Sequence, residues 1–287
     1  MADFSDLGAA GDVLQGHYGA ADDRRHGFYI PVLSRALHYD RVSGYFTSAG
    51  LAAAAQGLAT FLPGGGTMRL VVGAQLNEAD VAAISKPGDL DEALASALSG
   101  STALEEDLGD VIHHRYREVL TWMVATGRCE IKVGLKRGPE GLPIPATADP
   151  NYFHHKLGVF TDAAGAQVAF FGSGNETWSG WVGNSESFSV VASWWGTDWW
   201  AAQGAPVAAE IDEMWLGNAG PEWMVVDLPT AVRDRLLKFA PSEMPPPKDA
   251  ADPVEPPKII PVLKPDDVLA GDIADLLGRL RDRPGSG

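Results

Sequence analysis

The chain has 287 residues, of which 45% are hydrophobic, and its 22 lysines and arginines against 38 acids give a formal net charge of −16 at pH 7. This charge argues against a generic nucleic-acid binder, because such proteins contact phosphates through a basic face. One cysteine, Cys129, excludes an internal disulfide framework. The amino terminus has no basic signal region and no stretch offers 18 consecutive apolar residues, so we expect a cytoplasmic protein without a membrane span.

Candidate strands and helices alternate along the first 217 residues. Strands are expected at 41–47, 68–73, 129–135, 154–160, 168–171 and 187–195. Helices are expected at 48–62, 77–98, 102–126 and 205–216. The first strand, helix and second strand predict a parallel pair joined by a right-handed crossover. The pattern as a whole indicates an α/β fold.

Composition divides the chain into four expected parts. Residues 1–27 read as an entry segment and residues 28–240 as one domain. Residues 241–264 are rich in proline and predict a semi-rigid linker. In the tail, 265–287, leucines and an isoleucine at helical spacing predict a short amphipathic helix.

The predicted strand 154–160 carries two of the candidate catalytic side chains. Successive strand residues face opposite sides of a sheet, so His154 and Lys156 are expected on one face and His155 on the other. We interpret His155 as a packed or hydrogen-bonded sheet residue and leave it outside the site.

The next two predicted strands bring further polar groups to the same rim. The apolar run 168–171 delivers Ser173 and Asn175 at its end, among glycines that let a ligand approach the backbone. Glu186 stands at the entrance of the strand that follows. The sequence therefore predicts that an imidazole, an ammonium, an amide and a carboxylate meet at one edge of a sheet.

Other roles for these residues stay open at this point. Asn175 is also a good turn cap, and Glu176 competes with Glu186 for the imidazole. Trp178 and Trp181 are suited to stacking on a base and equally to core packing.

Positive charge is concentrated in the segment that leads into this stretch. Residues 111–160 hold seven basic residues against four acids, whereas residues 78–110 hold nine acids against Lys86 alone. We take Arg137 from this basic segment, together with Trp178, as candidate substrate-binding residues.

The polar stretch resembles the signature of the phospholipase D superfamily, which is His-x-Lys followed by Gly-Ser-x-Asn on a neighbouring strand. The matching residues are His154, Lys156, Gly172, Ser173 and Asn175, with Glu186 eleven positions later. The resemblance covers about 35 residues and is nearest to the nuclease branch, which includes metal-independent restriction endonucleases and modules of bacterial defence helicases. The family often has an aspartate where this chain has Thr161, so Asp162 receives no role.

The resemblance implies a fold and a mechanism. The fold is a mixed, mostly parallel sheet flanked by helices on both faces. In the mechanism His154 attacks phosphorus and forms a phosphohistidine, Glu186 orients it, and Lys156 and Asn175 stabilise the phosphoryl oxygens. Ser173 of the Gly-Ser-x-Asn motif is also taken as a catalytic residue. No cofactor and no metal are implied.

The resemblance also implies partners. The chain has a single His-x-Lys, so the second histidine comes from a homodimer with one shared site. The expected substrate is DNA, with a helicase or other defence-system protein as a possible partner. The alternatives are a phospholipase or phosphatidyl transferase, and a non-catalytic module that recognises phosphate.

Overall fold

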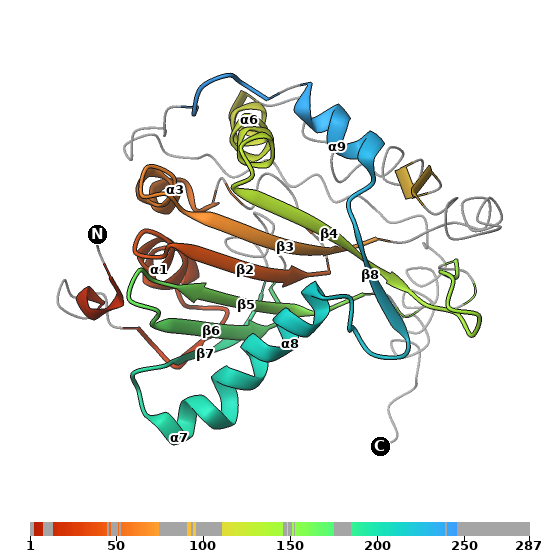
Figure 1. Ribbon diagram of the computed structural model, residues 1–287. Helices are drawn as coiled ribbons and strands as arrows, with labels where there is room; N and C mark the ends of the chain where they lie inside the picture. Colours follow the sequence, from red (N-terminus) through yellow and green to blue (C-terminus); the bar gives the residue numbers. More distant parts are fainter. Residues whose placement is uncertain are drawn as a thin grey trace, which may run out of the picture. The chain divides into compact units, whose positions relative to one another are not determined.

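One mixed sheet forms the centre of the protein in the computed structural model (Figure 1). The structure describes residues 3–7, 14–44, 46, 51, 53–74, 91–92, 94–95, 111–145, 148, 151, 153–174, 185–238 and 240–245. Its strands are β1 (His17–Tyr18), β2 (His38–Ser43), β3 (Thr67–Gly73), β4 (Cys129–Lys136), β5 (Lys156–Thr161), β6 (Gln167–Gly172), β7 (Phe188–Ala192) and β8 (Trp223–Asp227). They lie in the order β1-β7-β6-β5-β2-β3-β4-β8.

The prediction of a mixed α/β sheet is confirmed, but the sheet is mostly antiparallel rather than mostly parallel. Among the strands that the structure describes, only the pairs β2–β3 and β3–β4 run parallel, and the first of these confirms the predicted parallel pair. The other neighbours run antiparallel. For β5–β6 and β6–β7 the reason is that these strands follow one another along the chain and pair in that order. The five residues between β5 and β6 make a hairpin, and such a short connection cannot cross over to a parallel strand.

Helices cover both faces of the sheet, as predicted. The described helices are α1 (Ile30–Leu33), α3 (Ala55–Phe61), α6 (Val111–Ala125), α7 (Thr197–Trp199), α8 (Ala205–Trp215) and α9 (Thr230–Leu237). Short turns of 3-10 helix (Phe4–Asp6) and π-helix (Arg25–Tyr29 and Trp200–Gly204) complete them. Helix α8 crosses in front of the sheet in Figure 1, and its buried residues form one core with Val42, Val71 and Val159.

The other face of the sheet carries a core rich in aromatic rings. Tyr39 of β2 stacks on Phe160 of β5 at 4.1 Å between ring centroids, and Phe170 of β6 packs beside them. Residues of α1, α3 and α6 close this core. It is the face on which alternation places Lys156, two residues before Gly158 and four before Phe160.

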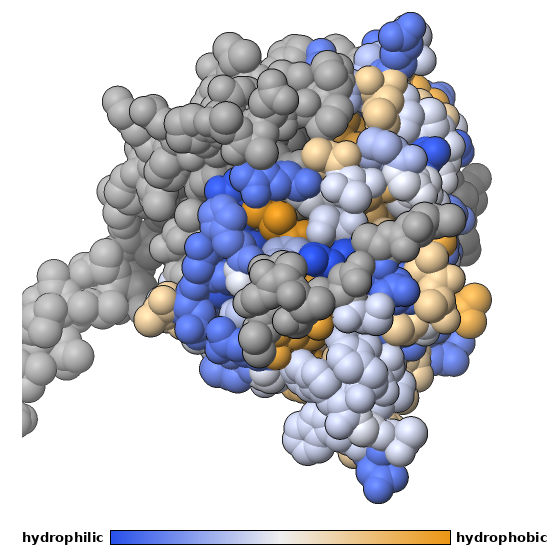
Figure 2. Space-filling view, turned by 90° about the vertical axis from the view of Figure 1, so that its left-hand side faces the viewer, coloured by the Kyte–Doolittle hydropathy of each residue, from blue (hydrophilic) through white to orange (hydrophobic). Residues whose placement is uncertain are grey.

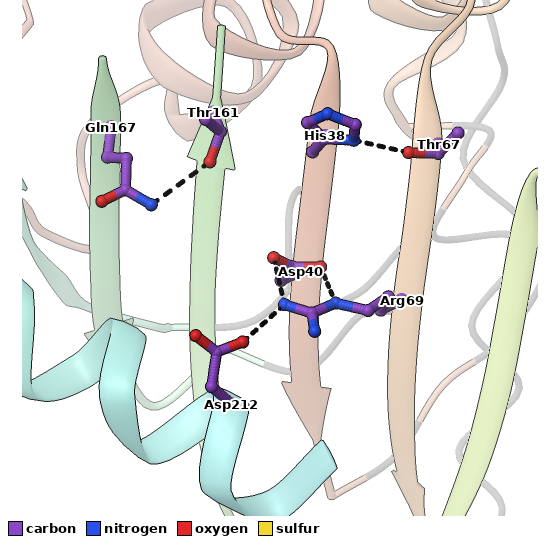
Figure 3. Close-up of polar contacts among 7 residues, drawn as sticks. All are labelled: His38, Asp40, Thr67, Arg69, Thr161, Gln167 and Asp212. Carbon is purple, nitrogen blue, oxygen red and sulfur yellow. Dashed lines mark hydrogen bonds and ion pairs between the residues drawn. The ribbon is translucent and has the colours of Figure 1, made fainter. Parts of the chain in front are cut away.

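A network of charges ties α8 to the sheet (Figure 3). Arg69 of β3 donates to both carboxylate oxygens of Asp40 on β2, at 2.6 and 2.8 Å, and to Asp212 of α8 at 2.7 Å. Its guanidinium also lies 5.4 Å from the ring centroid of Trp215. One side chain thus connects two strands and the helix above them.

Three exposed tryptophans follow β7: Trp194, Trp195 and Trp199. Trp194 packs against Phe4, with 5.7 Å between the ring centroids.

On the side of the molecule that lies at the left of Figure 1, hydrophobic residues form separate orange areas among hydrophilic ones (Figure 2). The coloured residues in that view therefore make no continuous apolar face.

The chain divides into two compact units, Met1–Val254 and Glu255–Gly287. The second unit, and with it the predicted C-terminal helix, lies outside the described residues. The same holds for the predicted helix 77–98 except Asp91, Glu92, Leu94 and Ala95, and for the first nine residues of the predicted helix 102–126. Most of the predicted linker also lies outside them.

Candidate active site

The edge of the sheet where β5 begins brings together four of the candidate residues. Lys156 is the first residue of β5, Ser173 directly follows β6, and Glu186 lies two residues before β7. These three strands are neighbours, and their register places Leu157 opposite Phe171 and Gly172 opposite Phe188. His154 precedes β5 at the same edge.

Lys156 is buried in this edge, with a relative exposure of 5%. Its Nζ donates to the backbone carbonyl of His154 at 3.0 Å. Burial, followed by the positive charge of Arg41, lowers the pKa of Lys156 to about 8, and Glu186 acts in the opposite direction. Burying a charged ammonium costs folding free energy, and this cost appears as the lowered pKa. Groups with strongly shifted pKa values occur at functional sites more often than elsewhere.

His154 lies at the surface beside this lysine. Partial burial, and then the charge of Lys156, lower its pKa below the ordinary 6.5, while Glu186 raises it. The lowered pKa favours the neutral imidazole, which is the state that a nucleophile requires. Glu186 raises the pKa of both His154 and Lys156, so the protonation of these two groups depends on the charge of Glu186.

His155 faces the other way, toward α8. Its ring packs on Phe153 at 4.9 Å, and its Nε2 lies 3.7 Å from a carboxylate oxygen of Glu210. Burial lowers its pKa. This placement agrees with the interpretation of His155 as a packed sheet residue.

Ser173 and Ser187 hold together the two ends of the connection between β6 and β7. The N–H of Ser173 donates to the carbonyl of Ser187 at 3.0 Å, and its Oγ accepts from the N–H of Ser187 at 3.0 Å. Gly172 permits this approach, since a Cβ there would lie 2.3 Å from the carbonyl oxygen of Ser187. Asn175 and Trp178 follow Ser173 in the sequence and lie outside the described residues.

Two buried arginines, which sequence reasoning missed, hold the two ends of the same connection. Arg41 of β2 donates to the carbonyl of Gly174 at 2.6 Å, and Arg24 donates to the carbonyl of Glu186 at 2.6 Å. They are 1% and 3% exposed. An arginine is almost never fully buried unless it has a partner, and the partners of Arg24 and Arg41 are distant in the sequence.

Two further residues lie apart from this group. Arg137 directly follows β4, which is three strands from β5 in the sheet, so strand spacing alone separates them by about 14 Å. Asp162 lies at the opposite end of β5 from Lys156 and is buried, and its carboxylate accepts from the N–H groups of Phe4, Ala164 and Ala166. Asp162 thus anchors the hairpin between β5 and β6.

Neither a metal-ligand cluster nor a membrane-crossing helix occurs in the part of the chain that the structure describes. Within those ranges, no three or more His, Cys, Asp or Glu side chains gather as metal ligands would. No described helix combines the length and apolar character needed to cross a bilayer.

Comparison with known proteins gives structural likenesses alone, since no family model and no curated protein matches the sequence. NucT from Helicobacter pylori is 9% identical with a TM-score of 0.35, over 68% of this chain and 94% of that chain. Phosphatidylserine synthase of Haemophilus influenzae Rd KW20 is 13% identical with a TM-score of 0.40, over 77% of this chain and 43% of that chain. Nuc from Salmonella typhimurium, a phospholipase D family member, is 12% identical with a TM-score of 0.34, over 72% and 94%.

Because these TM-scores lie below 0.5, they give no residue of this chain a role. The function proposed below rests on the side chains at the sheet edge and on the sequence motif.

Proposed function

We propose that this protein is a metal-independent phosphodiesterase that cleaves DNA, with His154 as its nucleophile. The observation that carries the proposal is the pairing of the exposed imidazole of His154 with the buried ammonium of Lys156 at one strand end. A phosphodiester is an anion, and its transition state gathers further negative charge on the oxygens around phosphorus. A fixed positive charge beside a neutral nucleophile favours that transition state.

The expected reaction has two displacement steps. An imidazole nitrogen of His154 attacks phosphorus, the P–O bond to the leaving strand breaks, and the leaving oxygen takes a proton from an acid on the opposite side. Water then attacks the phosphohistidine, the P–N bond breaks, and the proton of that water returns to the same acid–base group. Lys156 stabilises the phosphoryl oxygens, Ser173 and Asn175 are the expected hydrogen-bond donors, and Glu186 stabilises the imidazolium that forms.

A homodimer supplies the second acid–base group in this proposal. One histidine cannot stand on both sides of an in-line displacement, and the sequence contains a single His-x-Lys. His154 of the partner subunit would therefore act as the acid, because a two-fold axis through the shared site would relate the two subunits. A strict monomer that still turns over would contradict this part of the proposal.

The choice of DNA follows the nuclease branch that the motif resembles and is independent of net charge. A chain with a formal charge of −16 gains little from general attraction to phosphates, so we propose that DNA is bound weakly or delivered by a partner. A helicase or another protein of a bacterial defence system, acting in the cytoplasm, is the proposed source of that delivery.

The test is cleavage of end-labelled single- and double-stranded oligonucleotides in the presence of EDTA. The His154→Ala variant should lose cleavage, whereas the matched control His155→Gln, which alters the adjacent histidine on the other face, should retain it. The generic diester bis(p-nitrophenyl) phosphate is assayed in parallel, so that a poor choice of oligonucleotide does not hide phosphodiesterase activity.

Other outcomes favour the alternative functions. Cleavage of phospholipid vesicles but of no oligonucleotide would favour a phospholipase or phosphatidyl transferase. A wild-type protein that cleaves neither substrate, nor the generic diester, would favour a non-catalytic module that recognises phosphate.

A further inference from the structure

Arg41 occupies an unusual position for a charged side chain. It lies in the middle of β2, on the sheet face that carries the aromatic core, and it is 1% exposed. Its guanidinium lies 4.9 Å from the ring centroid of Phe170, which suits the planar cation. A buried arginine needs strong partners to offset its desolvation.

The strands around Arg41 are shaped to hold it. In the register of β2 and β5, Arg41 is opposite Gly158, where a Cβ would lie 2.2 Å from the ring of Phe170. The missing side chain at Gly158 lets the Phe170 ring lie under the guanidinium. Arg41 in turn donates to the carbonyl of Gly174 at 2.6 Å, across two strands of the sheet.

We propose that Arg41 is a positioning residue for the site: it fixes the Gly174 carbonyl, and so the backbone that follows Ser173, against the Lys156 end of β5. This inference rests on the proposed function for the meaning of the site, and it goes beyond the His-x-Lys and Gly-Ser-x-Asn residues. Arg41 is buried and so acts through its neighbours rather than on the substrate.

A second consequence of this position is electrostatic. The charged and titratable groups that act on Lys156 and its neighbour His154 are Arg41 from β2, Glu186 before β7, and His155 beside them. Burial is the largest cause of the lowered pKa of Lys156, and Arg41 is the next. Because Lys156 must be charged to stabilise the phosphoryl oxygens, Arg41 helps to set the alkaline limit of activity.

The experiment compares Arg41→Gln with Arg41→Lys. Arg41→Gln keeps an N–H donor and removes the charge, whereas Arg41→Lys keeps the charge and loses the planar fork that binds the carbonyl and stacks on Phe170. Arg69→Gln is the matched control, because it removes an arginine from β3 on the opposite face of the sheet, where its partners are Asp40 and Asp212. Circular dichroism and thermal melting establish that each variant is folded.

The first readout is the pH profile of DNA cleavage in EDTA. Arg41→Gln should cleave at least about tenfold more slowly at pH 7, and its alkaline limb should lie about one pH unit higher than in the wild type. Arg41→Lys should also cleave more slowly, but its activity should fall at the same alkaline pH as that of the wild type. Arg69→Gln should leave the alkaline limb unmoved, which separates loss of the Arg41 charge from a general loss of stability.

The second readout does not depend on activity. The rate at which acetic anhydride modifies Lys156, followed by mass spectrometry of the peptide across pH, reports the fraction of neutral amine. The wild type should titrate near 8, and Arg41→Gln should titrate higher. A wild-type Lys156 that titrates near its ordinary 10.5, or identical titrations and pH limbs in wild type and Arg41→Gln, would overturn the inference. Failure of the wild type to cleave any diester contradicts the proposed function alone, since the titration still decides how Arg41 acts on Lys156.

Discussion

Replacing Lys156 with methionine should make the protein more stable while abolishing its activity. The pKa of Lys156 falls from 10.5 to about 8, chiefly through burial. At about 1.4 kcal/mol for each pH unit, the charged lysine costs the folded state about 3 kcal/mol. Methionine fills a similar volume without charge and loses the bond from Nζ to the His154 carbonyl, worth about 1 kcal/mol. The expected gain is about 2 kcal/mol in the free energy of unfolding at pH 7.

The pH dependence of this gain follows from the direction of the pKa change. Below pH 8, Lys156 is charged in both the folded and the unfolded chain, so the wild type carries the full cost. Between pH 8 and 10.5 the folded chain has released the proton while the unfolded chain still holds it. The unfolding free energy of the wild type therefore rises with pH relative to the variant, and above 10.5 the cost of the buried charge is gone.

Urea denaturation at pH 7, 8.5 and 10 measures this difference. The matched control is Lys132→Met, since Lys132 is partly exposed and lies 3.1 Å from the exposed carboxylate of Asp227. That change should lower stability by less than about 1 kcal/mol. A Lys156→Met variant less stable than the wild type at pH 7, or a difference that does not shrink toward pH 10, would refute the reasoning.

Three further changes test separate parts of the structure. Glu186→Gln should shift the alkaline limb of the cleavage profile in EDTA to lower pH, because Glu186 raises the pKa of Lys156; an unmoved limb would contradict their coupling. Gly158→Ala should cost about 1–3 kcal/mol in urea denaturation, because its Cβ would lie 2.2 Å from the Phe170 ring, and a neutral effect would show that the ring moves freely. Arg69→Met should cost about 1–2 kcal/mol by the same assay, since it leaves two carboxylates unpaired, and unchanged stability would refute the role given to this network (Figure 3).

The sequence predicted those elements whose pattern depends on local periodicity. The apolar run before Gly172 became β6, and the helix expected at 205–216 is α8 (Ala205–Trp215). The local sequence pattern could not predict whether neighbouring strands run parallel or antiparallel, because this depends on which strands pair. The hairpin pairing of β5 to β7 contributes to a mostly antiparallel sheet. The short edge strand β1 and strand β8 were missed, since each is defined mainly by its partner.

The candidate site was predictable as far as its motif extended. The spacing of His154 and Lys156, and the glycines around Ser173, identified the strand ends that meet at one edge. Arg24 and Arg41 could not be assigned from the sequence, because their roles depend on contacts 162 and 133 residues away along the chain. Arg137 was chosen for its charge within a basic segment, and the sheet order separates it from the other candidates.

The most direct test of the central claim is the identity of the residue that becomes phosphorylated. Wild-type protein is mixed with an oligonucleotide in EDTA, quenched at alkaline pH, where phosphohistidine survives, and digested for mass spectrometry. The account predicts a nucleotide or phosphoryl adduct on the peptide that contains His154, and none in the His154→Ala variant. Turnover with no adduct, or an adduct on another residue, would contradict it.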